Sequence, residues 1–130
     1  MFIQNLSPTQ QGVLLWLVKR MIKADGIISE GEENMLAIIE TQCDDNCIKV
    51  DNVEMSNLKT IYQTERAKSS LMLELLAVAY ADGDYHESEQ GLIEEVSKNI
   101  GFLKSKISDM ENWVQRQLIL TSESEIFMED

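Results

Sequence analysis

The chain contains one short motif twice, and this duplication constrains its fold more than any other feature. The first copy is the segment 24–32, ADGIISEGE, and the second is the segment 81–89, ADGDYHESE. Asp25 and Asp82 are 57 residues apart, as are Glu32 and Glu89. An apolar segment precedes each copy, and a segment with apolar residues at helical spacing follows it. The sequence therefore predicts an internal repeat of helix, acidic turn and helix.

The first copy of the motif carries signals for the end of one helix and the start of the next. Gly26, like Gly83 in the second copy, stands where a helix end favours a residue with positive φ. Ser29 and Glu32 form a capping-box pattern, in which each side chain bonds the backbone N–H of the other residue. We therefore expect a helix to begin near Glu30.

The second copy differs from the first at the cap. His86 replaces the serine, so we expect a weaker cap there. Glu89 is retained in the first turn, where the helix dipole favours an anion. Asp25 and Asp82, in contrast, fall at helix C-termini, where the dipole disfavours a carboxylate by about 0.3–1 kcal/mol. The same unfavourable placement at two equivalent positions indicates a functional site.

Composition limits the class of protein. A chain of 130 residues with 44% hydrophobic residues is expected to form one globular domain. The net charge of −12, from 23 acidic and 11 basic side chains, argues against a nucleic-acid binder and favours cations or basic proteins as partners. No apolar run is long enough to span a membrane and residues 1–6 do not form a signal peptide, so we expect a soluble, cytoplasmic protein.

The two cysteines, Cys43 and Cys47, are too few for a disulfide scaffold. We expect reduced thiols near a helix end, with a redox pair as the alternative.

Helical periodicity without any sustained period-two alternation predicts an all-α fold. We expect a single bundle of about six helices built from two repeats related by a pseudo-twofold axis. Ser7, Pro8 and Gln10 are expected to open the first helix, and the strongly apolar helices that end near Lys23 and at Ala81 are expected to be central. Asn52 is expected to cap a short helix, Gly101 to end the fifth helix, and Ser108 with Glu111 to open the last one. The predicted organisation is a domain at 1–120, with repeats at about 8–43 and about 65–101, followed by an acidic tail at 121–130.

A calcium EF-hand is the first comparison for the acidic turns, and it fails. Residues 25–32 match the second half of a twelve-residue EF-hand loop, but the first half requires Asp or Asn at two further positions. Those positions hold Met21 and Lys23 in the first copy and Val78 and Tyr80 in the second. The oxygen ligands of an EF-hand are therefore missing.

Four carboxylates remain as candidate metal ligands: Asp25, Glu32, Asp82 and Glu89. If the two turns pack close together, their mutual repulsion is relieved by a divalent cation or by raised pKa values. Oxygen ligands without His or Cys select Ca²⁺ or Mg²⁺. The alternative is that both glutamates only cap helices and both aspartates are solvated. A metal-dependent hydrolase is the weakest interpretation, because no nucleophile stands beside a base.

At these residues the chain resembles the tellurite-resistance TerB-like domains, from about residue 11 to about residue 114. The resemblance rests on the duplicated apolar helix followed by Ala-Asp-Gly and a glutamate. It implies an all-helical domain whose acidic positions, here Asp25, Glu32, Asp82 and Glu89, bind a divalent metal. It also implies a role without enzymatic activity in stress response or metal sensing, through partner proteins. A metal-free acidic adaptor for a basic partner is the alternative.

Overall fold

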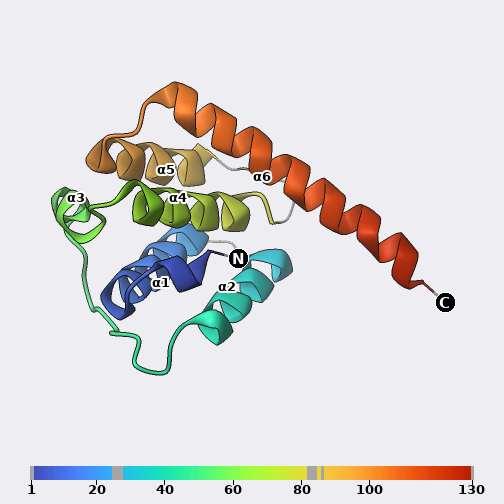
Figure 1. The fold of residues 1–130 in the computed structure, drawn as a ribbon, viewed down its shortest axis with the longest axis horizontal. Coiled ribbons are helices and arrows are strands. Elements are labelled where there is room, and N and C mark those ends of the chain that lie inside the picture. The colour runs from blue at the N-terminus through green and yellow to red at the C-terminus, as the bar shows by residue number, and fades with distance from the viewer. Residues whose placement is uncertain (1, 25–27, 82–84, 86, 130) are drawn as a thin grey trace.

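The computed structural model describes residues 2–24, 28–81, 85 and 87–129. Within them the chain forms α-helices and short 3-10 helices and no strand, which confirms the all-α prediction (Figure 1). The six α-helices are α1 (Pro8–Lys23), α2 (Glu30–Gln42), α3 (Leu58–Ile61), α4 (Glu65–Ala79), α5 (Glu87–Ile100) and α6 (Lys104–Ser124). The 3-10 helices are η1 (Ile3–Asn5), η2 (Met55–Asn57) and η3 (Glu125–Met128).

Helices α1 and α4 form the centre of the bundle. Ser7 caps α1 in a complete capping box with Gln10, and Pro8 occupies the first helical position, as the sequence predicts. The apolar stripe of α1 packs against α4, whose own apolar residues are buried along nearly its whole length. Fully buried residues of this core include Leu14, Leu17, Val18, Leu71, Leu75 and Leu76.

The remaining helices pack around this pair (Figure 1). Helix α2 contacts α1 and α4, α5 contacts α4, α1 and α3, and α6 crosses α4 on the other side from α2. The C-terminal part of α6 extends beyond the bundle, where Ile119 and Leu120 are exposed. Among the described residues, no helix combines the length and the hydropathy needed to cross a bilayer.

Gly101 ends α5, as predicted. Its φ of 82° lies in the left-handed region, and the Phe102 N–H donates to the Ser97 carbonyl at 2.9 Å, which closes the last turn. The other predicted helix-ending glycines, Gly26 and Gly83, and the variant cap residue His86 lie outside the described residues.

Two predicted helix starts are wrong. Helix α6 begins at Lys104 with Leu103 at the N-cap, and Ser108 lies inside the helix. Because Ile107 is buried together with the later apolar residues of α6, tertiary packing extends the helix toward its N-terminus past the capping-box pattern. Asn52 caps no helix, since η2 begins only at Met55 and runs directly into α3.

The predicted repeats correspond to α1–α2 and to α4–α5, joined by the connection that contains η2 and α3. The pseudo-twofold relation between them remains a prediction.

Candidate functional site

Glu32 lies in the first turn of α2, next to the first acidic turn. Its side chain accepts the Ser29 N–H at 3.2 Å, while the Ser29 hydroxyl accepts the Glu32 N–H at 3.1 Å, so the predicted capping box is present. Only 2% of Glu32 is exposed. The carboxylate is therefore held against the helix N-terminus and away from solvent.

Glu89 has the corresponding place in the first turn of α5, and only 1% of it is exposed. Glu30 and Glu87, in the same two first turns, are exposed instead. Each helix therefore begins with one buried and at least one solvated glutamate. Sequence reasoning chose Glu32 and Glu89 as candidate ligands, but Glu30 and Glu87 repeat at the same offset of 57 residues, so the repeat alone does not separate the two pairs.

The described ends of the helices lie on one side of the molecule. In Figure 1, α1 and α4 both end on the side toward which α6 extends, and α2 and α5 both begin there. The predicted ligands Asp25 and Asp82 lie outside the described residues. Within the part of the chain that the structure describes, no three His, Cys, Asp or Glu side chains converge on a common point.

The EF-hand positions confirm why that motif fails. Met21 and Val78 are fully buried in the core, so neither side chain points toward a cation outside the bundle. The Tyr80 side chain forms a hydrogen bond with Glu111 instead.

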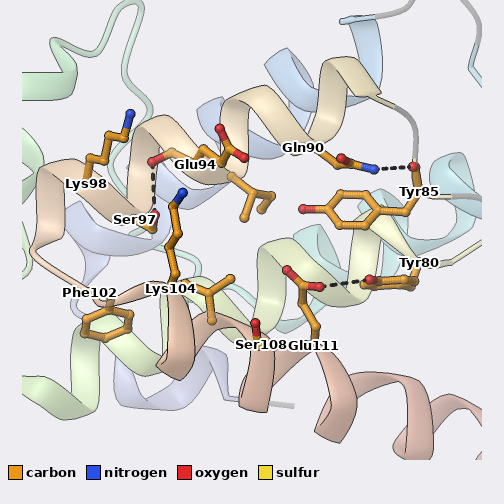
Figure 2. Close-up of a pocket in the computed structure, with 12 residues that line it drawn as sticks. Tyr80, Tyr85, Gln90, Glu94, Ser97, Lys98, Phe102, Lys104, Ser108 and Glu111 are labelled. Atoms are coloured by element: carbon orange, nitrogen blue, oxygen red, sulfur yellow. Dashed lines mark hydrogen bonds between the residues drawn. The ribbon is translucent and has the colours of Figure 1, made fainter.

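Two tyrosines that the sequence did not single out as functional lie at the second acidic turn: Tyr80 directly precedes it and Tyr85 lies within it. The Tyr80 hydroxyl donates to Glu111 Oε2 at 3.3 Å, and the Tyr80 and Tyr85 rings lie 4.7 Å apart, tilted by 52° (Figure 2). Burial, followed by the Glu111 charge, raises the pKa of Tyr80 to about 12. The pKa of Tyr85 is raised further, first by burial and then by the charges of Glu111 and other neighbours. Both phenols are neutral at physiological pH.

Glu111 joins this region from α6, and no local pattern in the sequence could have placed it there. The sequence pattern suggested that Glu111 belongs to a capping box at the start of the helix. In the structure Glu111 lies two turns into α6, and its carboxylate accepts a hydrogen bond from Tyr80 at the end of α4. Only the packing of α6 across α4 brings it near the second acidic turn.

A third buried glutamate, Glu74, has a structural role. Glu74 of α4 accepts the backbone N–H of Phe2 at 2.6 Å, which ties the N-terminus to the central helix. Gln11 has a similar role, because its amide donates to the Leu6 carbonyl at 3.0 Å and accepts the Asp44 N–H at 2.9 Å. Both residues have structural partners that account for their burial.

The cysteines are free thiols at the end of α2, where Cys43 is the C-cap residue. Burial, followed by the proximity of Cys47, raises the pKa of Cys43 to about 11. Because the thiolate is the nucleophile and the metal ligand, Cys43 is not activated at neutral pH.

The chemistry of the two buried glutamates fits a hard cation. A buried carboxylate costs free energy unless opposite charge or hydrogen bonds compensate it. The helix dipole and one N–H supply part of this compensation at Glu32. Carboxylate oxygens are also the ligands that Ca²⁺ and Mg²⁺ prefer.

Comparison with protein families identifies the chain. The model of the family described as tellurite resistance protein TerB matches residues 10–112. The chain belongs to the TerB family. No curated protein and no solved structure matches it significantly.

The match to TerB covers α1 to α5, both acidic turns and the packed beginning of α6. The part of α6 that extends beyond the bundle lies outside it. The shared features of TerB domains are therefore to be sought in the repeats and in their contacts with the start of α6.

Proposed function

We propose that this TerB domain is a non-enzymatic module that binds a divalent cation, Ca²⁺ or Mg²⁺, and acts in stress response or metal sensing through partner proteins. The proposed ligands are Asp25, Glu32, Asp82 and Glu89. The observation that carries the proposal is the burial of a glutamate at the equivalent position of both repeats, directly after each acidic turn.

The proposal rests on a difference between neighbouring glutamates. A solvated first-turn glutamate stabilises a helix through the dipole at little cost, and Glu30 and Glu87 do so. Burial of Glu32 and Glu89 adds a desolvation cost that a cap alone does not require. A divalent cation between the turns would offset that cost and hold the two repeats together.

Thermal unfolding of EDTA-treated protein, with and without Ca²⁺, Mg²⁺ or Mn²⁺, tests the proposal. An ion at 100 times its Kd adds about 2.7 kcal/mol to the unfolding free energy, which raises the Tm of a chain of this size by roughly 10 °C. The rise should vanish in the Asp25→Asn/Asp82→Asn variant, each protein being compared with its own EDTA baseline.

Glu30→Gln/Glu87→Gln is the matched control, because it removes two charges from the same first turns at exposed positions. The control should keep the full rise in Tm. An equal loss in the control and in the aspartate variant would mean that diffuse negative charge, rather than coordination, attracts the ion. No rise for any of the three ions in the wild type would contradict the proposal.

The net charge of −12 supports a second candidate, a metal-free acidic adaptor for a basic partner. Salt separates the two functions. Binding through an exposed acidic surface weakens steeply as ionic strength rises, whereas coordination by buried carboxylates is screened much less. In the adaptor, Glu30→Gln/Glu87→Gln should weaken partner binding as strongly as the substitution of both aspartates.

A further inference from the structure

A second candidate site lies between α5 and α6, and it is independent of the metal proposal. The α5–α6 groove has a volume of about 380 Å³ and is half open to solvent. This volume is within the range of small-molecule sites. Its lining residues are Tyr80, Tyr85, Gln90, Ile93, Glu94, Ser97, Lys98, Phe102, Lys104, Ile107, Ser108 and Glu111.

The charges of the α5–α6 groove are separated along its length. Figure 2 shows Lys98 and Lys104 at one end, and the two tyrosines with Glu111 at the other. Glu94 of α5 lies between these two ends in the same view.

The lysines of the groove are available to a ligand. The chain has 11 basic side chains against 23 acidic ones, yet neither Lys98 nor Lys104 forms an ion pair with another residue in the described ranges. Lys106, two residues after Lys104 in α6, pairs instead with Glu65 at 2.9 Å. Two cationic groups without a carboxylate partner at one end of a groove suit an anionic group of a ligand.

The opposite end of the groove suits a cation. An ammonium group is attracted by the faces of aromatic rings, and the Tyr80 and Tyr85 rings lie side by side there. The Glu111 carboxylate adjoins them, since the Tyr80 hydroxyl donates to it. Ile93 and Ile107, both largely buried, contribute apolar surface to the groove lining.

We propose that the α5–α6 groove binds a small zwitterion, with its ammonium group at Tyr80, Tyr85 and Glu111 and its carboxylate at Lys98 and Lys104. The two ends of the groove are well separated, since Lys104 and Glu111 are seven residues, or about 10.5 Å of helix rise, apart along α6. An ω-amino acid with a chain of several carbons matches this separation better than an α-amino acid does.

Calorimetric titration in EDTA at fixed ionic strength tests this proposal without any contribution from metal. The probes are 4-aminobutanoate, 6-aminohexanoate and 8-aminooctanoate, compared with hexanoate and hexylamine, which each keep one charge. We expect saturable binding of the longer amino acids at one site, and at least tenfold weaker binding of both single-charge analogues.

Variants at the two ends assign the orientation. Glu111→Gln should weaken 6-aminohexanoate and hexylamine about tenfold and leave hexanoate unchanged, whereas Lys98→Gln/Lys104→Gln should weaken 6-aminohexanoate and hexanoate and leave hexylamine unchanged. Glu95→Gln and Lys49→Gln/Lys59→Gln make the same charge changes at exposed positions outside the groove and should have no effect.

Either of two results would overturn the proposal. One is the absence of saturable binding by all three amino acids. The other is that 6-aminohexanoate binds no more tightly than hexylamine and is not weakened by the lysine substitutions, which would make the groove a site for cations alone. Neither result bears on metal binding by the acidic turns, because that test uses other variants and a different measurement.

Discussion

Gly12 has no room for a side chain. It lies in α1, where the backbone carbonyl of Ile48 approaches so closely that a Cβ on Gly12 would overlap it. The approach is fixed by the Ile48 N–H, which donates to the Pro8 carbonyl at 3.1 Å. The connection after α2 is therefore attached to the first turns of α1 through backbone contacts that only glycine permits.

Gly12→Ala should lower the unfolding free energy by about 1–3 kcal/mol, because the new methyl group displaces the backbone at Ile48. Gly91→Ala is the matched control: Gly91 is also helical, and a Cβ there meets no atom within 4 Å. The control should stabilise the protein by about 0.5–1 kcal/mol through its higher helix propensity. Urea unfolding of the two variants measures both changes, and equal stabilisation by both would contradict the close approach.

Local sequence patterns predicted some helix ends correctly and failed at another. The capping boxes at Ser7 and Ser29 and the helix end at Gly101 were predicted correctly, because each depends on residues within a few positions of itself. The same pattern at Ser108 was misleading. There, burial of Ile107 and Met110 against the bundle outweighs a local cap.

At the scale of elements, α6 is the helix whose two halves differ most. Its buried residues, Ile107, Met110 and Val114, all belong to the first half. The second half carries exposed Ile119 and Leu120 and ends in η3, whose Phe127 is 89% exposed. The predicted boundary between domain and tail at residue 120 therefore falls inside a continuous helix.

Removal of residues 121–130 should change the unfolding free energy by no more than about 0.5 kcal/mol, because the deleted segment buries almost no apolar surface in the bundle. Removal of residues 113–130 is the contrasting variant. It also deletes Trp113, which packs against Phe2, together with buried Val114, and should cost several kcal/mol. Circular dichroism melting measures both. A large loss from the shorter truncation would show that the extended end supports the core.

At the scale of the whole molecule, charge dominates. Because the net charge is −12 on 130 residues, the acidic side chains repel one another more strongly in the compact folded state than in the expanded unfolded chain. Cations from solution reduce this repulsion. Both proposed functions depend on this excess of negative charge, whereas the α5–α6 groove is locally balanced by two of the few lysines.

Unfolding free energy should therefore rise as NaCl increases from 0.01 to 0.15 M, over which the screening length falls from about 30 Å to about 8 Å. Urea titrations at several salt concentrations measure this rise. CaCl₂ at the same ionic strength is the control for coordination: a larger rise than in NaCl indicates a bound ion, and an equal rise indicates screening alone. A fall in stability with NaCl would mean that attractive ion pairs outweigh the net repulsion.

The sequence by itself determined the all-α class, the central helices α1 and α4, two of the caps, and membership of the TerB family. These features depend on periodicity and on neighbours along the chain, which a sequence states directly. It also offered Glu32 and Glu89 as candidate ligands, although Glu30 and Glu87 repeat at the same offset and the repeat says nothing about which pair is buried.

Only the tertiary structure decided that these two glutamates are buried while Glu30 and Glu87 are solvated. The same holds for the contact of Glu111 with Tyr80 and for the placement of Lys98 and Lys104 at the other end of the α5–α6 groove from Glu111. Each of these features depends on how a helix is rotated about its own axis relative to the helix or the core against which it packs. That rotation is set by the packing of the whole bundle, so no short segment of the chain specifies it.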